Sequence, residues 1–480
     1  MWQPVLMIGG YVVCILGALM LIPAGFDATD SLFANNWSPF VKSSVISIFF
    51  GCSLFLSNYK KIEKITIKQA YLVTIISWLM ICLFASLPLI FYDAVPNITD
   101  ALFESFSGVT GTGASVISDV EALPKSILLW RSLLNGLGAL GVVIFAVALL
   151  PFLGIGGMQM FQKENSDSND KIMPRFSYIA KRIILVYFLL VAIATVILFF
   201  CGMTWFDAVN HAISAIGTGG FSTKNNSIAF YNSSLIEFFV MVFMIMGAIP
   251  MTFYILLWKK NVKDKNNQIK IFLKLVFVLS MLLGVYLYVH SDYSFLTAIR
   301  YTFFSVISFI TTTGLSSCNF INWGIWTTIV FVFISFIGGC TGSTCGSIKI
   351  FRWQVVLAFF KKYFLSAIEP SRVVPLKVGE VSTDEKVSLS VFVYVLSFIL
   401  CLMFLTIVVS FCGVDFSTAF ASVVACITNT GVGSVEVIGP AGNYSFFPPI
   451  VKWVLCLAMF LGRLEVITVL VLLTKSFWRR

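Results

Sequence analysis

Long apolar runs separated by short charged clusters dominate this chain. Runs of about 20 apolar residues predict membrane-spanning helices. Ten such runs cover residues 4–26, 38–57, 70–92, 125–152, 178–202, 234–258, 270–290, 322–360, 387–412 and 449–474. The first run has no basic start and is long for a signal peptide, which favours a first span over a cleaved leader.

Composition and charge agree with a membrane protein. The 480 residues are 59% hydrophobic and 11% charged, whereas soluble proteins carry about 25% charged residues. Most of the 32 Lys and Arg residues fall in segments 58–69, 153–182, 257–274, 349–386 and 475–480. Because cytoplasmic loops are rich in Lys and Arg, threading the ten spans with these segments inside places both termini in the cytoplasm. The net charge of +10 is therefore attributed to the basic cytoplasmic loops that set the membrane topology, and no nucleic-acid partner is expected.

Four outward-facing links carry a short apolar stretch followed by a cluster of small residues. Each cluster is a β-branched residue, three residues drawn from Thr, Gly and Asn, and a terminal Gly. They are Val109-Thr110-Gly111-Thr112-Gly113, Ile216-Gly217-Thr218-Gly219-Gly220, Ile310-Thr311-Thr312-Thr313-Gly314 and Ile427-Thr428-Asn429-Thr430-Gly431. Upstream, Ala101, Ala208, Thr302 and Ala419 stand at matching offsets. The clusters therefore mark an internal repeat of about a hundred residues.

Two spans separate each cluster from the next, so all four clusters lie on one side of the membrane and the repeats are parallel. Inverted repeats would instead build a site at the membrane midplane from broken helices. We expect an all-α integral membrane protein with four parallel helix–pore loop–helix repeats around one pore, preceded by two extra transmembrane helices. The predicted divisions are 1–69 for the two extra helices and 70–170, 171–265, 266–375 and 376–480 for the four repeats.

The four clusters suit a cation path. A dehydrated cation needs its water oxygens replaced, and backbone carbonyls do this without adding net charge. Glycine permits the backbone angles that point carbonyls inward, and a preceding short helix directs its partly negative C-terminus at the cation. Ordinary turns also favour Asn, Asp, Pro and Lys, whereas these clusters are uncharged and recur four times. We predict that they form a selectivity filter.

The run 322–360 is too long for one span, which needs about 20 residues. A small-residue segment interrupts it: Gly338-Gly339-Cys340-Thr341-Gly342-Ser343-Thr344-Cys345-Gly346. This pattern predicts two half-helices joined by a gating loop below the filter, which moves when a cytosolic partner acts on Lys349 and Arg352. An ordinary kink is the alternative, because Gly is common in membrane helices.

Arg463 is expected in the middle of the last span, just cytoplasmic of the filter. An Arg at a helix centre costs about 2.5–3.5 kcal/mol to insert, so such residues face an interior or a cavity. Two roles are open: an electrostatic barrier to passing cations, or a fastener to backbone carbonyls of the run 322–360. Glu465 points to another helix face and is not expected to pair with Arg463.

Together with Trp130-Arg131-Ser132-Leu133-Leu134 and Gly462-Arg463-Leu464-Glu465, these motifs resemble the Trk/Ktr/HKT superfamily of potassium transporters. The resemblance covers essentially the whole chain, and the two extra N-terminal spans are similar to its bacterial TrkH/TrkG branch. It implies K⁺ uptake across the bacterial inner membrane, K⁺ ions in the filter, and no covalently bound cofactor. It also implies a homodimer with one pore per subunit and gating by a cytosolic, nucleotide-binding TrkA-type protein.

Two positions refine that resemblance. In plant relatives, Ser at the first filter glycine is associated with Na⁺ transport, so Gly113 favours K⁺. After the Ser343-Thr344 pair, relatives are often richer in Gly, whereas Cys345 and Ser347 stand here.

Other functions have less support. No HExxH, GxSxG or paired-Asp motif indicates an enzyme. The 11 Cys form no CxxC pair and there are only two His, so no zinc or other transition-metal site is indicated. A redox pairing of Cys340 with Cys345 would need favourable geometry. A cation-coupled (H⁺ or Na⁺) symporter remains the alternative, because small polar loops in membranes serve both designs.

Overall fold

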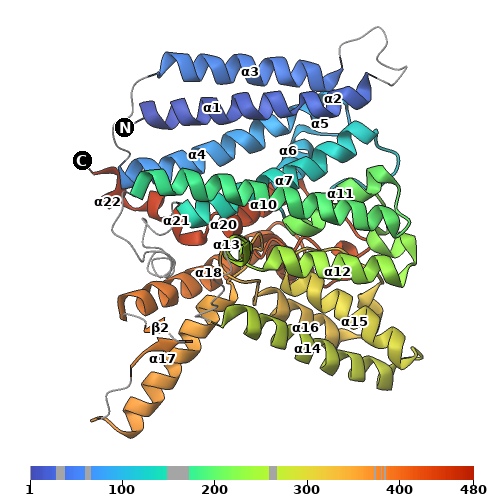
Figure 1. Cartoon of the computed structure of the whole chain (residues 1–480), viewed down its shortest axis with the longest axis vertical. Coiled ribbons are helices and arrows are strands. Elements are labelled where there is room, and N and C mark those ends of the chain that lie inside the picture. The colour runs from blue at the N-terminus through green and yellow to red at the C-terminus, as the bar shows by residue number, and fades with distance from the viewer. Residues whose placement is uncertain are drawn as a thin grey trace.

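The computed structural model describes residues 2–28, 38–59, 66–148, 172–258, 267–371, 375–379, 381–382 and 385–479. Helices account for most of these residues, and the one sheet among them is a hairpin of two short strands, β1 (Lys377–Val378) and β2 (Val381–Ser382). Long helices run side by side through the molecule, and both chain ends lie at the same end of this bundle (Figure 1). Parts of all five basic segments and the end of the run 125–152 lie outside the described residues.

All ten predicted runs are helical over most of the length that is described. In the described part of the chain, seven helices or joined helices are long and apolar enough to cross a membrane. They are α1–α2 (Gln3–Leu19 and Leu21–Asp27), α3 (Pro39–Ser57), α4–α5 (Ile67–Ala85 and Leu87–Phe91), α7 (Lys125–Ala148), α10 (Ile172–Phe200), α14 (Gln268–His290) and α18 (Glu385–Phe411). The count rises to nine if each of two bent pairs is one span.

Those two bent pairs correct the prediction of continuous spans at 234–258 and 449–474. The first consists of α12 (Ser234–Ala248) and α13 (Met251–Trp258), bent by 92°. Pro250 lies at this break, and proline cannot donate the backbone hydrogen bond that continues a helix. The second consists of α20 (Pro449–Arg463) and α21 (Val466–Leu470), bent by 111°. There Glu465 has a left-handed backbone, with φ of 65°.

One long run is divided, and two short elements follow α21 at the C-terminal end. The run 322–360 consists of α16 (Ile325–Ser335) and α17 (Ile350–Ile368), with residues 336–349 between them. After α21 come the 3-10 helix η5 (Val471–Leu473) and α22 (Lys475–Trp478). Outside the spans lie the 3-10 helices η2 (Ser227–Tyr231), η3 (Phe320–Trp323) and η4 (Glu436–Ile438).

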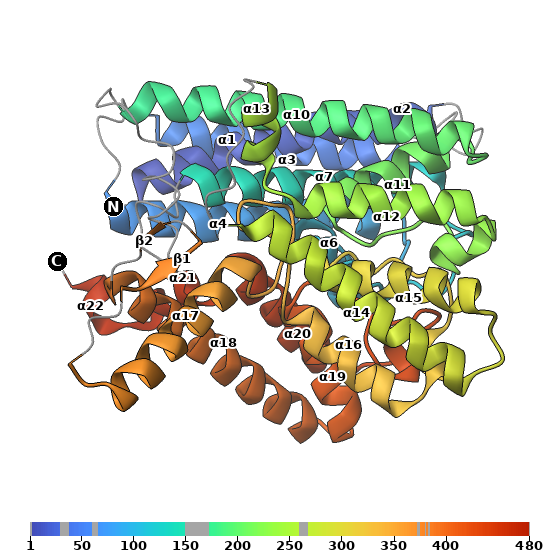
Figure 2. The same ribbon diagram turned by 60° about the horizontal axis from the view of Figure 1, so that its bottom comes forward.

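A short helix precedes each small-residue cluster. These pore helices are α6 (Ile98–Thr110), α11 (Trp205–Gly217), α15 (Phe295–Ile310) and α19 (Phe416–Ile427). Each packs against the long helix before it and the helix after it. The same arrangement of three helices therefore occurs four times, in α4–α6–α7, α10–α11–α12, α14–α15–α16 and α18–α19–α20. The four pore helices lie in the half of the molecule farther from the termini (Figures 1 and 2).

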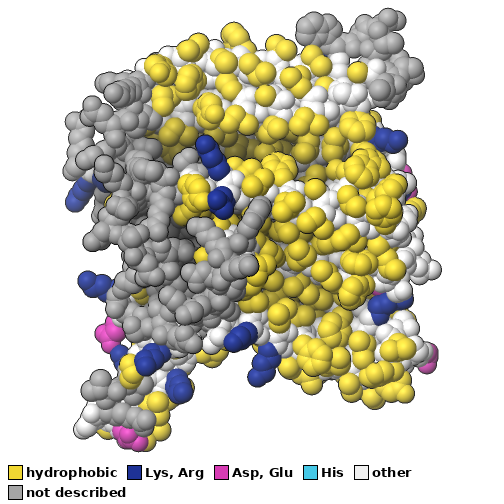
Figure 3. All heavy atoms as spheres, in the orientation of Figure 1, with side chains coloured by type: hydrophobic (Ala, Val, Ile, Leu, Met, Phe, Trp, Pro, Cys, Tyr) yellow, Lys and Arg dark blue, Asp and Glu magenta, His cyan; other side chains and the backbone are white. Residues whose placement is uncertain are grey.

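The outer surface is apolar while the centre is polar. Phe188, Phe200, Phe277, Leu282 and Phe404 are all more than half exposed, and Figure 3 shows hydrophobic side chains covering the face formed by α3, α10, α12 and α14. Surfaces of this extent are rare on soluble monomers. The buried centre instead holds the Thr, Asn and Gly residues of the four clusters. This inside-out distribution fits a protein that sits in lipid and encloses a polar path.

Candidate ion pathway

The four pore helices end in the same backbone motif. The N–H of the fourth cluster residue donates to the carbonyl five residues earlier at 2.9 Å, and the N–H of the third donates to the carbonyl three residues earlier. The first set of bonds joins Thr112 to Ser107, Gly219 to Ser214, Thr313 to Ser308 and Thr430 to Ala425. This pair of bonds is the Schellman motif, which ends a helix with a left-handed residue. The chain therefore turns off each pore helix at an equivalent point.

The left-handed residue is the third of each cluster, a position that the sequence analysis did not single out. Its φ is 62° at Gly111, 48° at Thr218, 54° at Thr312 and 58° at Asn429. A left-handed backbone is rare for a β-branched residue such as Thr. Residues held in such regions cost about 1–3 kcal/mol and cluster at functional sites. The recurrence of this conformation in all four repeats indicates that the turn is required there.

The terminal glycines interlock the four loops. Their φ values lie between 75° and 80°. A Cβ atom on Gly113 would lie 2.6 Å from the carbonyl oxygen of Gly219. On Gly220, Gly314 and Gly431 it would come still closer to the carbonyls of Thr313, Thr430 and Thr112, respectively. Each terminal glycine thus touches the fourth residue of the next loop, in the cyclic order first, second, third, fourth, first.

Threonine hydroxyls brace three of the loops. The second and fourth cluster residues are hydrogen-bonded through their side chains at 2.7 Å in the first and third loops and 2.9 Å in the fourth. In the second loop both positions are glycine, and Asn135 of α7 occupies the space beside Gly219. Asn135 was not predicted from the sequence, although glycine in place of threonine at the second and fourth positions of this cluster, Gly217 and Gly219, was a signal that another group fills the space.

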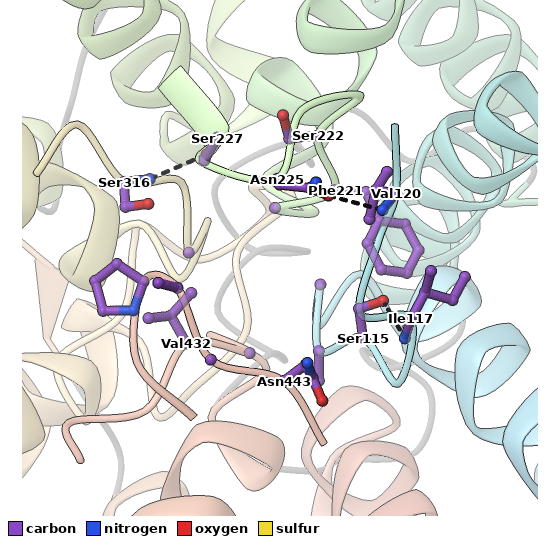
Figure 4. Close-up of a pocket in the computed structure, with 18 of the residues that line it drawn as sticks. Ser115, Ile117, Val120, Phe221, Ser222, Asn225, Ser227, Ser316, Val432 and Asn443 are labelled. Atoms are coloured by element: carbon purple, nitrogen blue, oxygen red, sulfur yellow. Dashed lines mark hydrogen bonds between the residues drawn. The ribbon is translucent and has the colours of Figure 1, made fainter. Parts of the chain in front are cut away.

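On the terminal-glycine side, a cavity of about 150 Å³ opens above the four loops. The four glycines contribute to its lining, and serine and asparagine side chains from the following segments surround it, among them Ser115, Ser222, Asn225, Ser316 and Asn443 (Figure 4). Of the described residues that line it, none is an Asp or Glu. We call this cavity the vestibule.

Two carboxylates hold the edge of the vestibule from outside. Asn225 donates its side-chain N–H to Asp119 at 2.9 Å and its backbone N–H to Glu121 at 3.1 Å. The hydrogen bond from Asn225 lowers the pKa of the Asp119 carboxyl below its ordinary value. Asp119 therefore remains ionised to lower pH than a free aspartate, and it keeps a negative charge near the mouth of the cavity.

On the opposite side, the predicted gating loop lies directly against the small-residue clusters. The Gly346 N–H donates to the Thr312 hydroxyl at 2.9 Å, and the Thr218 hydroxyl donates to the Thr344 hydroxyl at 3.2 Å. A Cβ on Gly346 would lie 2.5 Å from the Thr428 carbonyl. Every residue of segment 338–346 is buried. Its contacts reach the second, third and fourth clusters.

Arg463 lies at the end of a helix rather than in the middle of one, which corrects the expected position. It is the last residue of α20, immediately before the 111° bend. Its guanidinium lies beside Gly111, since a Cβ there would be 3.3 Å from Nη2. Nη1 donates to the Thr344 carbonyl at 2.9 Å. Arg463 is thus both next to the filter and fastened to the predicted gating loop, so the two expected roles are not exclusive.

Arg352 and Glu465 form a buried ion pair behind this loop. The Arg352 guanidinium also lies over the Tyr394 ring, with its Cζ 3.7 Å from the ring centre. Lys349 is buried beside them and has a left-handed backbone, with φ of 74°. Cys340 and Cys345 are both buried, and neither forms a disulfide. The first turn of α17 is therefore tied to the break between α20 and α21.

An apolar outer surface, bent helix pairs and a buried polar centre define a multi-span integral membrane protein. A family model described as TrkH, cation transport protein, matches residues 37–479. The chain belongs to the TrkH family of cation transport proteins, which confirms the resemblance drawn from its motifs and excludes an enzyme.

Individual relatives match over most of their length. The chain is 32% identical over 478 residues to the Trk system potassium uptake protein TrkH of Escherichia coli (strain K12), covering 97% of this chain and 98% of that protein. It is 35% identical over 415 residues to the Trk system potassium uptake protein TrkI of Halomonas elongata, covering 86% and 84%. The crystal structure of the potassium transporter TrkH from Vibrio parahaemolyticus superposes with a TM-score of 0.91 at 30% identity, covering 100% of both chains.

Substituting the terminal glycines should have graded effects. In Gly113→Ser, the new side chain displaces the Gly219 carbonyl, so we expect K⁺ flux to survive with lower K⁺ over Na⁺ discrimination. Gly431→Ser should be more damaging, because its Cβ would approach the Thr112 carbonyl more closely. Flux of K⁺ and Na⁺ into vesicles containing each purified variant measures both effects. Wild-type selectivity in a correctly folded Gly113→Ser protein would contradict this assignment of the filter.

Proposed function

We propose that this chain carries K⁺ into the bacterial cell across the inner membrane, through one pore enclosed by its four filter loops. The observation that carries the proposal is the cyclic contact of each terminal glycine with the next loop, because it brings four equivalent backbone segments together at one point. Relatives named as potassium uptake proteins support K⁺ as the substrate. The four repeats of the pore are assigned to residues 70–170, 171–265, 266–375 and 376–480.

Dehydration of the ion is the step that the filter performs. The residues assigned to it are Thr110, Gly111, Thr112, Gly113, Gly217, Thr218, Gly219, Gly220, Thr311, Thr312, Thr313, Gly314, Thr428, Asn429, Thr430 and Gly431. Their carbonyls replace the water oxygens of the cation. The C-termini of four pore helices point partial negative charge toward the same place. A K⁺ ion enters from the vestibule, passes the four loops, and then meets the gating loop.

The gating loop and Arg463 close the inner side of this path. In the proposal, segment 338–346 blocks the exit, and opening requires it to leave its contacts with Thr218 and Thr312. A cytosolic TrkA-type, nucleotide-binding partner supplies that movement through α17, and two copies of this chain form a homodimer with one pore each. Both termini then lie in the cytoplasm, which agrees with their position at the same end of the bundle (Figure 1).

A proton-coupled symporter is the alternative, and the buried carboxylates near the path argue against it. Such a mechanism needs a carboxylate that can exchange protons along the path. In the described residues, Glu104, Asp100 and Glu465 are instead each paired with a buried Arg or Lys. With no Asp or Glu among the described residues lining the vestibule, passive conduction is the simpler mechanism.

Flux into vesicles tests the proposed function. Purified wild-type protein should move K⁺ down an imposed K⁺ gradient, and the flux should be independent of separately imposed Na⁺ and H⁺ gradients apart from their effect on voltage. Flux that stops when the H⁺ or Na⁺ gradient is removed would establish the symporter instead. Equal movement of K⁺ and Na⁺ would contradict K⁺ selectivity.

Shortening the gating loop should raise basal flux. Deletion of residues 340–346 removes the segment that lies against the filter, so we expect K⁺ leak without any cytosolic partner. Vesicle K⁺ efflux, normalised to folded protein measured by size-exclusion chromatography, reports the effect. A folded deletion variant that transports no more than the parent protein would exclude a gating role for this loop.

Two substitutions separate the two roles of Arg463. A guanidinium about 7 Å from a passing K⁺, at an effective dielectric near 20, raises the energy of the ion by about 2–3 kcal/mol. Arg463→Ala removes both the charge and the bond to Thr344, so K⁺ influx should rise. Arg463→Lys keeps the charge but not the forked donor geometry. Low flux in Arg463→Lys indicates a charge barrier, and high flux indicates that the fastening of the loop matters more. Unchanged currents in both variants would contradict both roles.

A further inference from the structure

A buried charged network lies beside the first and second filter loops, and its Arg131 is one of the residues that line the vestibule. Arg131 of α7 is 2% exposed and Glu104 of α6 is 1% exposed. Nε of Arg131 donates to the Glu104 carboxylate at 2.7 Å. Breaking a buried pair of this kind by removing one partner costs about 3–5 kcal/mol, because the other charge is left uncompensated. Neither residue is among the sixteen assigned to the filter, so the pair needs its own explanation.

The Arg131 guanidinium reaches both neighbouring filter loops. Nη2 donates to the Ser115 hydroxyl at 3.2 Å, and Nη1 donates to the Ser222 carbonyl at 3.3 Å. Its Cζ lies 4.0 Å from the centre of the Phe221 ring. Ser115 and Ser222 each stand two residues after a terminal glycine, and both lie at the edge of the vestibule (Figure 4). One side chain therefore joins equivalent points of the first and second repeats.

Glu104 holds the same backbone from the other side. Its carboxylate accepts hydrogen bonds from the Ser115 hydroxyl at 3.1 Å and from the Val116 N–H at 3.1 Å. The Ser115 carbonyl in turn accepts from the Tyr444 N–H at 2.8 Å, and the Tyr444 hydroxyl donates to the Gly431 carbonyl at 2.8 Å. The network thus runs from the second loop through the first to the terminal glycine of the fourth.

The other repeats lack this charge. At the position of Glu104, nine residues before the terminal glycine, the second repeat has His211, and the third and fourth have Ser305 and Ser422. His211 makes the corresponding hydrogen bond, between Nε2 and the Ser222 hydroxyl at 2.9 Å. The Ser422 hydroxyl donates to its own helix at Ala419. The Arg131–Glu104 network is therefore found on only one side of the filter, although the backbone of the four loops is nearly fourfold symmetric.

We propose that Arg131, oriented by Glu104, is a positioning residue that sets ion selectivity. It does so by holding in register the two chain segments that follow the first and second filter loops. The inference rests on the proposed function, because selectivity has meaning only if the four loops select K⁺. The planar guanidinium suits this role, since its fork of donors reaches several acceptors in fixed directions, which the single ammonium of lysine does not. If these two segments are held less firmly, the carbonyls of Gly113 and Gly220 can move closer to a smaller ion such as Na⁺.

Two variants test the proposal while avoiding an unpaired buried charge. Arg131→Lys keeps the ion pair with Glu104 but loses at least one bond to Ser115 or Ser222. The double variant Glu104→Gln with Arg131→Met removes both charges and keeps an acceptor for Val116. In both we expect the K⁺ over Na⁺ flux ratio in vesicles to fall about fivefold, the equivalent of one lost hydrogen bond of about 1 kcal/mol. K⁺ flux itself should remain within about twofold of wild type, since the lost hydrogen bond is not made to the ion.

An ion pair that joins a different pair of repeats serves as the control. Glu237 of α12 and Arg300 of α15 lie 3.1 Å apart and join the second and third repeats. Among the residues that the structure describes, no hydrogen bond of either side chain reaches the segments that follow the filter glycines. The double variant Glu237→Gln with Arg300→Met should lower thermal stability without changing the flux ratio. This control separates a general loss of packing between repeats from a specific effect on the filter.

The flux ratios decide the outcome. One outcome would overturn the inference and leave the proposed function intact. In it, the wild-type protein is K⁺-selective, and the Arg131 variants fold and lose stability but keep the wild-type K⁺ over Na⁺ flux ratio. A control variant whose ratio falls as far as theirs would also overturn it, because the effect would then be unspecific. Wild-type protein that passes K⁺ and Na⁺ equally would overturn the proposed function and this inference with it. A fall confined to the Arg131 variants supports the positioning role.

Discussion

The close approach of each terminal glycine to a carbonyl of the next loop is the constraint on which the rest of the structure depends. A side chain at any of these four positions would overlap the neighbouring backbone. The loops can meet only if every repeat presents its cluster at the same depth and in the same direction. The shared Schellman turn meets this requirement locally, because it ends each pore helix at an equivalent residue. The packing of each pore helix between two longer helices then fixes its position.

Backbone groups that leave regular helices inside a membrane must find partners within the protein. The backbone groups at the bend near Pro250 and those of the gating loop are hydrogen-bonded to one another in this way. The carbonyls of Gly247 and Ala248, which the end of α12 leaves free, accept from the N–H groups of Thr344 and Cys340 at 3.2 and 3.0 Å. In the other direction, the Met251 N–H donates to the Gly342 carbonyl at 3.1 Å. The two interruptions therefore form one hydrogen-bonded unit, and a change in either helix pair acts on the segment beneath the filter.

The sequence by itself determined the class of protein, the positions of most helices and the four small-residue clusters that we propose as the filter. Apolar runs of about 20 residues rarely form anything other than membrane-spanning helices. A pattern that recurs four times at equal offsets can be recognised without any tertiary information. The terminal glycines, such as Gly113 and Gly431, were identifiable because only glycine repeats at that position. The division of the run 322–360 was likewise predictable from its length.

Tertiary structure alone decided which distant residues meet. The bends after Ala248 and Arg463 were not predicted, although Pro250 marks the first of them in the sequence, because hydropathy does not report the direction in which a helix runs. The left-handed backbone of Thr218 and Thr312 contradicts the local preference of threonine, so only the surrounding packing can impose it. The pairing of Glu104 with Arg131 and of Arg352 with Glu465 joins residues far apart in the chain. Such contacts follow from how the repeats close into a ring, which no local pattern encodes.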